Sequence, residues 1–247
     1  MGLKKAIGRI FHSRRFPLWL LAAFLAWFAL WAIRPPHPSD FILEHLLTVA
    51  GVGVLCATYR WFRMSNISYM LLFIFLCLHV VGAHYTYAEV PYEEWIATAA
   101  SWFGAEGFDL RSALGFKRNH YDRLVHFAFG LLCVYPVREI FLRVARVKGF
   151  WGYYLPLDVA MSFSMLYELL EWAVAMFAGD GGQAYLGTQG DEWDAHKDMA
   201  LASAGALLAM SATAFINWRL KKDFAAEFID SLKPKDPAPL GESEVKE

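Results

Sequence analysis

Six long apolar runs constrain the fold of this chain more than any other feature. They cover residues 17–33, 40–59, 67–87, 121–141, 153–177 and 193–218. Each run is about as long as a helix must be to cross the hydrocarbon core of a bilayer. Backbone groups in hydrocarbon must be satisfied internally, and a helix does this within a single segment. The sequence therefore predicts an all-α fold, a polytopic integral membrane protein with a bundle of about six transmembrane helices.

The composition agrees with that class of protein. Of 247 residues, 57% are hydrophobic and 17% aromatic, and the formal net charge is −1. Ordinary soluble domains are less apolar, and a nearly neutral chain lacks the basic surface of a nucleic-acid-binding protein. We therefore expect membrane lipids and no nucleic acid among the partners. Cys56, Cys77 and Cys133 each lie in an apolar run, where a free thiol packs like a small hydrophobic group.

The distribution of lysine and arginine predicts the orientation. Basic residues gather in residues 1–16, 60–66, 138–148 and 219–222, whereas the loop at 88–119 is acidic or mixed. Because basic loops favour the cytoplasmic side, both termini are expected in the cytoplasm. The chain then divides into a basic N-terminus (1–16), a six-helix transmembrane domain (17–218) and a charged cytoplasmic tail (219–247). Three prolines and many charges predict that most of the tail is disordered.

The last apolar run begins inside an acidic segment. Asp191, Asp194 and Asp198 are spaced i, i+3 and i+7, which places them on one face of a helix. Carboxylates at membrane depth are costly, so they need charge partners or a function.

Two other runs carry polar pairs with helical spacing. Asp122 and His126 are four residues apart, and Glu168 and Glu171 are three apart. In the expected orientation these pairs and the acidic segment all lie in the outer half of the bilayer. Carboxylates and imidazole on facing bundle helices are the ligands of buried divalent-metal sites. The resulting hypothetical metal ligands are Asp122, His126, Glu168, Glu171, Asp194 and Asp198, and a divalent metal ion is the only cofactor that the sequence suggests.

Two structural interpretations compete with the site hypothesis. Asn119-x-x-Asp122 and Asp191-x-x-Asp194 resemble capping boxes, in which a side chain satisfies the free amides of a helix start. Capping does not reach His126, Asp198 or the mid-helix Glu168. For these residues the alternative is a structural ion-pair network, partly neutralised by Arg123 and Lys197. His79 and His84 lie in the run at 67–87. They join the cluster only if the side of that helix that carries them faces the bundle interior.

Three blocks in fixed order resemble the YjdF family of bacterial inner-membrane proteins. The blocks are Tyr121-Asp122-Arg123-Leu124-Val125-His126-Phe127, then Tyr167-Glu168-Leu169-Leu170-Glu171-Trp172, then Leu186-Gly187-Thr188-Gln189-Gly190-Asp191 with Trp193-Asp194 and Lys197-Asp198-Met199. The resemblance implies a multi-pass protein of the bacterial inner membrane. Because that family is a domain of unknown function, the resemblance implies a topology and a site but no reaction.

A more distant similarity is to VanZ-like membrane proteins, which are associated with glycopeptide resistance and the cell envelope. It rests on Asp122 with His126, on Glu168, and on Asp198 followed by Gly205-Ala206. Arg123 stands where those proteins have lysine, and Ala202 where they have asparagine. Such an analogy suggests an envelope role without fixing the chemistry.

Three functions stay open, and whether the chain is an enzyme stays open with them. The first is an envelope enzyme acting on a lipid-linked substrate. In it the catalytic acids, bases or ligands would be His126, Glu168, Asp194 and Asp198, and the substrate contacts would be Gln189, Asp191 and Arg123, while Asp122 orients His126. The second is a non-catalytic membrane scaffold or accessory protein. The third is a cation- or proton-coupled transporter, which the scarcity of polar groups in the inner half disfavours.

Overall fold

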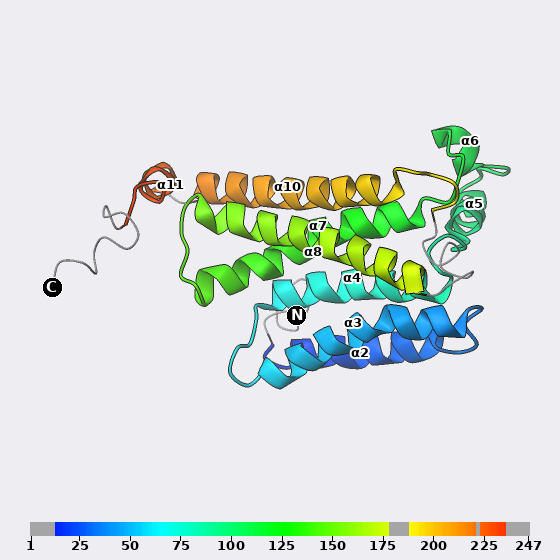
Figure 1. The fold of residues 1–247 in the computed structure, drawn as a ribbon, viewed down its shortest axis with the longest axis horizontal. Coiled ribbons are helices and arrows are strands. Elements are labelled where there is room, and N and C mark those ends of the chain that lie inside the picture. The colour runs from blue at the N-terminus through cyan, green and yellow to red at the C-terminus, as the bar shows by residue number, and fades with distance from the viewer. Residues whose placement is uncertain (1–12, 178–187, 221–222, 236–247) are drawn as a thin grey trace.

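The computed structural model describes residues 13–177, 188–220 and 223–235 (Figure 1). The expectations for residues 1–12, for the glycine-rich segment at 178–187, for Lys221 and Lys222, and for residues 236–247 lie outside the described residues. Within the described residues the fold is all-α, and no strand occurs among them.

Six apolar helices run side by side along the long axis (Figure 1). They are α2 (Phe16–Trp31), α3 (Pro38–Thr58), α4 (Asn66–His84), α7 (Tyr121–Arg143), α8 (Trp151–Phe177) and α10 (Asp194–Leu220). Five of them are long and apolar enough to cross a membrane, and α2, with 16 residues, is a shorter apolar helix. The predicted polytopic, all-α bundle is therefore confirmed, with helix ends within a few residues of the predicted runs.

Contacts at the two ends of the bundle show that successive helices alternate in direction. At one end the Tyr59 hydroxyl, just after α3, donates to the carbonyl of Arg14 before α2, at 3.0 Å. There the amide of Ser65, before α4, donates to Glu139 near the end of α7 at 2.8 Å. At the other end the ring of His84 lies 2.6 Å from the carbonyl oxygen of Trp31. We call this second end the outer end, following the predicted orientation.

The centre of the bundle is α7, which contacts α4, α8 and α10, while α2 and α3 pack on α4. The closest approach is between α7 and α10. A methyl group added at Gly130 would collide with the carbonyl of Ala202, and one at Gly205 with the carbonyl of Phe127. Small residues let helix backbones approach in this way in membranes.

Two segments contain helices where the sequence predicted a loop and a disordered tail. Residues 88–119 hold α5 (Tyr92–Trp102) and α6 (Leu110–Leu114) at the outer end. Residues 224–230 form α11 (Phe224–Asp230), and the following Ser231 accepts a hydrogen bond from the amide of Phe150 at 2.8 Å. The ring of Phe228 also packs against Phe150. These aromatic contacts order a stretch whose average composition favours disorder.

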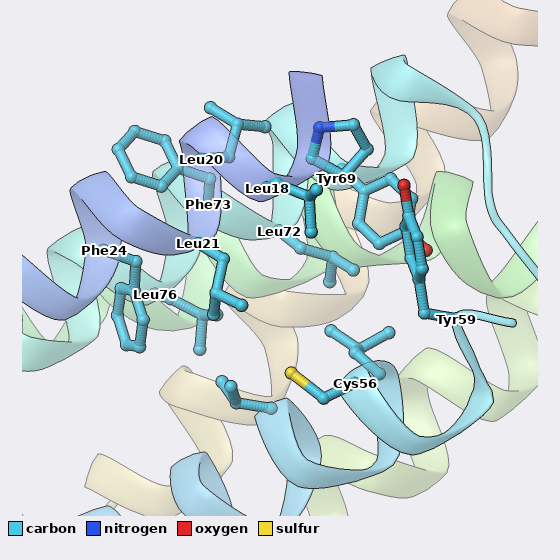
Figure 2. Close-up of a pocket in the computed structure, with 13 residues that line it drawn as sticks. Leu18, Leu20, Leu21, Phe24, Cys56, Tyr59, Tyr69, Leu72, Phe73 and Leu76 are labelled. Carbon is cyan, nitrogen blue, oxygen red and sulfur yellow. The ribbon is translucent and has the colours of Figure 1, made fainter. Parts of the chain in front are cut away.

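An apolar cavity of about 270 Å³ lies between α2, α3 and α4 (Figure 2). Its labelled lining consists of leucines and phenylalanines together with Cys56, Tyr59 and Tyr69. Since it brings together no carboxylate or imidazole, it is not a candidate for acid–base or metal chemistry.

Gly205→Leu is expected to destabilise the bundle, because the new side chain would meet the backbone of α7. Overpacking of this kind typically lowers the free energy of unfolding by about 1–3 kcal/mol, or more where backbone must move. Thermal unfolding in detergent measures the change. Gly53→Leu is the matched control, since no atom lies within 4 Å of an added Cβ there. Equal melting temperatures for the two variants would contradict the tight α7–α10 contact.

Candidate functional site

The polar residues of α7, α8 and α10 meet towards the outer end of the bundle. Asp122, His126 and Asp198 each place one ligand atom so that all three atoms lie within 4.8 Å of one another. The Nε2 atom of His126 is 3.5 Å from Asp122 Oδ1 and 3.4 Å from Glu168 Oε1. Side chains from three helices thus converge. We call Asp122, His126, Glu168 and Asp198 the inner cluster.

Helix packing explains why the inner cluster forms. His126 lies one turn before Gly130 on α7, and Asp198 lies one turn before Ala202 on α10. Because Gly130 and Ala202 touch through their backbones, the preceding turns of both helices must also lie close together. The small-residue contact therefore fixes the distance between the imidazole and the carboxylate.

His126 and Asp198 of the inner cluster are buried, and the cluster is incompletely hydrogen-bonded. Asp198 is 2% exposed and His126 is 7% exposed. Among the described residues, Asp198 Oδ1 and Glu168 Oε1 have no hydrogen-bond partner. The His126–carboxylate distances are also longer than a good hydrogen bond. Buried polar atoms without partners are rare and costly, so each one calls for an explanation. Three ligand atoms this near one another fit a single cation after a small inward shift.

A second group of charges, the ion-pair layer, lies at the outer start of α7 and α10. Arg118 Nη2 is 2.6 Å from Asp194 Oδ1. Arg123 Nη2 is 2.5 Å from Asp191 Oδ2 and 3.3 Å from Asp194 Oδ1. The ammonium group of Lys197 lies 2.6 Å from Asp191. Asp191 and Asp194 are therefore neutralised by three cations, including Arg123 and Lys197, which the sequence offered as partners of a network around His126, Glu168 and Asp198.

The sequence analysis missed Arg118. This side chain is 10% exposed, and it also donates to the carbonyl of Thr188 at 2.5 Å. The available signal was a basic residue four positions before Asp122, in a loop expected to be acidic or mixed on the outer side. Arg123, predicted as a substrate contact, is engaged with both aspartates of the ion-pair layer.

Gln189 is held by the backbone of the neighbouring loop. Its Oε1 accepts from the amide of Asn119 at 3.0 Å, and its Nε2 donates to the carbonyl of Asn119 at 3.2 Å. Asn119 in turn accepts from the amide of Tyr121 at 2.9 Å, and Asp191 accepts from the amide of Trp193 at 3.1 Å. Because α7 begins at Tyr121 with His120 as its N-cap and α10 begins at Asp194, these bonds support the turns before the two helices and do not form the capping boxes considered from the sequence. A substrate contact through Gln189 stays a prediction, and it would have to replace these bonds.

A third set of polar groups extends the site towards α3 and α4. The hydroxyl of Tyr167 donates to Glu44 Oε2 at 2.6 Å, and the hydroxyl of Tyr87 lies 2.6 Å from His79 Nδ1. Glu171 lies one turn outward from Glu168 on α8, and it is not part of the group of three close ligand atoms. His79 therefore joins the polar region.

His84 points elsewhere, against the ring and carbonyl of Trp31. Tyr167 was not among the predicted site residues, and its position next to Glu168 was the only signal of a polar role.

A cavity of about 390 Å³ adjoins the inner cluster, between α3, α4, α7 and α8. Asp122 and His126 form part of its wall, with His79, Tyr87 and Tyr167 nearby. Its volume falls in the range of about 300–1,000 Å³ usual for small-ligand sites. The cavity gives a ligand room beside Asp122 and His126.

Comparison with known proteins places the chain in a family. Residues 16–219 match the family described as predicted membrane protein DUF2238. The chain belongs to this family. It is also 37% identical over 168 residues to the inner membrane protein YjdF of Escherichia coli (strain K12), which covers 68% of this chain and 74% of that protein. No solved structure matches the chain.

Family membership confirms the resemblance to YjdF and the expected location, a multi-pass protein of the inner membrane. Such a protein contacts membrane lipids. The more distant similarity to VanZ-like proteins stays a prediction.

The stabilising effect of Asp191 is expected to disappear in acid. A hydrogen bond from Lys197, helped by the amide of Trp193 and by Arg123, lowers the pKa of Asp191 to about 2. Because this pKa lies below the value of about 3.9 in an unfolded chain, the stabilisation is complete above about pH 4 and is lost as the pH falls towards about 2. The difference in melting temperature between wild type and Asp191→Asn should shrink over that range. Glu192→Gln, an exposed neighbour, is the control, and a difference that stays constant with pH would contradict the ion-pair layer.

Proposed function

We propose that this protein is a membrane enzyme whose inner cluster acts on the head group of a lipid-linked or amphipathic envelope substrate, reached from the outer leaflet. The observation that supports it is the pair of buried carboxylate oxygens without hydrogen-bond partners, on Glu168 and Asp198, near His126, which itself lines a cavity. In the ion-pair layer, by contrast, Asp191 and Asp194 each lie within 2.6 Å of a guanidinium or ammonium nitrogen.

In this proposal the ion-pair layer has a structural role and the inner cluster has a chemical role. The ion-pair layer, with Asp191 and Asp194, fixes the outer start of α10 against α7 and does not touch the substrate. The inner cluster does the chemistry. Glu168 Oε1 and Asp122 Oδ1 lie 3.4 and 3.5 Å from the same atom, His126 Nε2, so this nitrogen exchanges a proton with one of them when no metal ion is bound. Asp194 thereby moves from the predicted catalytic set to a positioning role.

A divalent cation bound by Asp122, His126 and Asp198 would complete the inner cluster. The ligand set combines an imidazole with carboxylates, which suits zinc or a similar transition metal. Such an ion polarises a carbonyl or phosphoryl oxygen, or lowers the proton affinity of a bound water. The protein would supply the ligands, the low-dielectric surroundings and the adjoining cavity.

A structural role for the inner cluster is the second candidate, because the charges of the ion-pair layer already hold two segments of the chain together. Arg118 and Arg123 tie residues 188–194 to the start of α7. If the inner cluster served the same purpose, its members would support helix packing in a scaffold or accessory subunit.

Wild-type protein purified in detergent is expected to carry close to one divalent transition-metal ion per chain, measured by elemental mass spectrometry. Asp198→Asn should lower that content by about tenfold or more, because it removes a ligand charge. Asp230→Asn is the matched control, since Asp230 is an exposed aspartate on α11 at the far end of the molecule.

The stability of the variants separates the two candidate functions. For an enzyme, Asp198→Asn should fold with little loss of melting temperature while the metal is lost. For a scaffold, single replacements should be strongly destabilising, and the combined change of His126, Glu168 and Asp198 to leucine should restore stability. The proposed enzyme would be refuted if wild-type protein carried no metal and the variants showed the stability changes expected of a scaffold.

A further inference from the structure

We infer that the cavity between α3, α4, α7 and α8 holds the hydrocarbon chain of a lipid of the outer leaflet, with the lipid head at the inner cluster. The chain enters sideways from the bilayer, between α3 and α8. This inference rests on the proposed function, because it assigns a substrate class to the same site.

The cavity has a polar end and an apolar end. Asp122, His79 and Tyr87 line it towards the outer end of the bundle, and Phe75, Phe129 and Phe163 line it towards the middle of the bundle. On α7, Phe129 follows Asp122 by seven residues, which is about 10 Å along the helix. On α4, which runs the other way, Phe75 precedes His79 by one turn. A lipid of the outer leaflet has this same arrangement, with its head outward and its chain towards the bilayer centre.

The mouth of the cavity faces bilayer hydrocarbon. Leu47 on α3 and Phe163, Leu166 and Leu170 on α8 line the cavity, and all four are half-exposed on membrane-spanning helices. Outward of Leu47, the hydrogen bond from Tyr167 to Glu44 joins α3 to α8. Leu47, Phe163 and Leu166 lie inward of this bond, so the opening between them is at the depth of lipid chains, where a chain can enter and a soluble molecule cannot.

The lining also limits how the head can be held. No lysine or arginine lines the cavity in the described part of the chain. A phosphate head would therefore meet carboxylates unless a bound cation lies between them. Chain binding and metal binding thus belong to two parts of one site, and they can be measured separately.

The test uses a phospholipid with a diazirine near the end of one acyl chain. Proteoliposomes of phosphatidylethanolamine and phosphatidylglycerol carry a trace of this probe, are irradiated, and the labelled residues are mapped by mass spectrometry. We expect labels at Phe75 and Phe129, which are partly buried inside the bundle. Thr48→Phe, which fills the cavity, should lower this labelling several-fold.

Two further variants keep the result interpretable. Leu166→Trp narrows the mouth at an exposed position, so it should fold even if Thr48→Phe does not, and it should lower the labelling as well. Leu208→Trp, at an equally exposed site on α10 away from the cavity, should leave it unchanged. Labels confined to outward-facing residues such as Phe215, with no effect of either cavity variant, would overturn the inference.

Metal content of the same preparations separates this inference from the proposed function. Bound metal without labelling at Phe75 and Phe129 would refute chain binding and leave the metal site standing. Labelling without metal would support chain binding and refute the metal-dependent chemistry.

Discussion

The backbone contact between α7 and α10 is the constraint on which the rest of the structure depends. Lipid tails are as apolar as leucine side chains, so helices in a membrane associate through close packing and polar contacts rather than through the hydrophobic effect. Gly130 and Gly205 allow that packing, each against a carbonyl of the opposite helix. One turn outward, the same approach forces His126 and Asp198 into a shared, dry space. The contact that stabilises the bundle therefore also creates the polar site.

The ion-pair layer and the inner cluster lie close together but differ in how their buried charges are compensated. In the ion-pair layer, Arg118 and Arg123 lie against Asp191 and Asp194, so the desolvation of each charge is offset by a close partner. In the inner cluster, carboxylates outnumber cations, and the imidazole of His126 stands at 3.4–3.5 Å from two of them. In the first arrangement each carboxylate has a cationic partner. The second is complete only with a proton, a metal ion or a ligand, which is why the functional proposal rests on it.

The sequence predicts the helices well because membrane burial imposes a length and a composition on each segment. It also predicts which helices carry polar groups, since the spacing of Asp122 and His126 or of Asp194 and Asp198 fixes a shared face. It does not predict which charges pair. Arg118 lies in a loop, and its contact with Asp194 depends on how residues 188–194 fold back across the start of α7. The bond from Tyr167 to Glu44 joins residues far apart in the sequence, and α11 is ordered by aromatic contacts that composition does not report.

The one-sided position of the polar groups limits what the site can do. A relay across the membrane needs ionisable groups in both halves of the bilayer, linked through the bundle interior. Here the inner cluster lies near the outer end, and the cavity continues inward between Phe75, Phe129 and Phe163. Towards the other end of the bundle, Asp158 is exposed on α8, and Glu139 is paired with Arg143 at 2.6 Å. A proton or cation reaching His126 therefore meets aromatic side chains beyond it, so the geometry favours chemistry at one leaflet over transport.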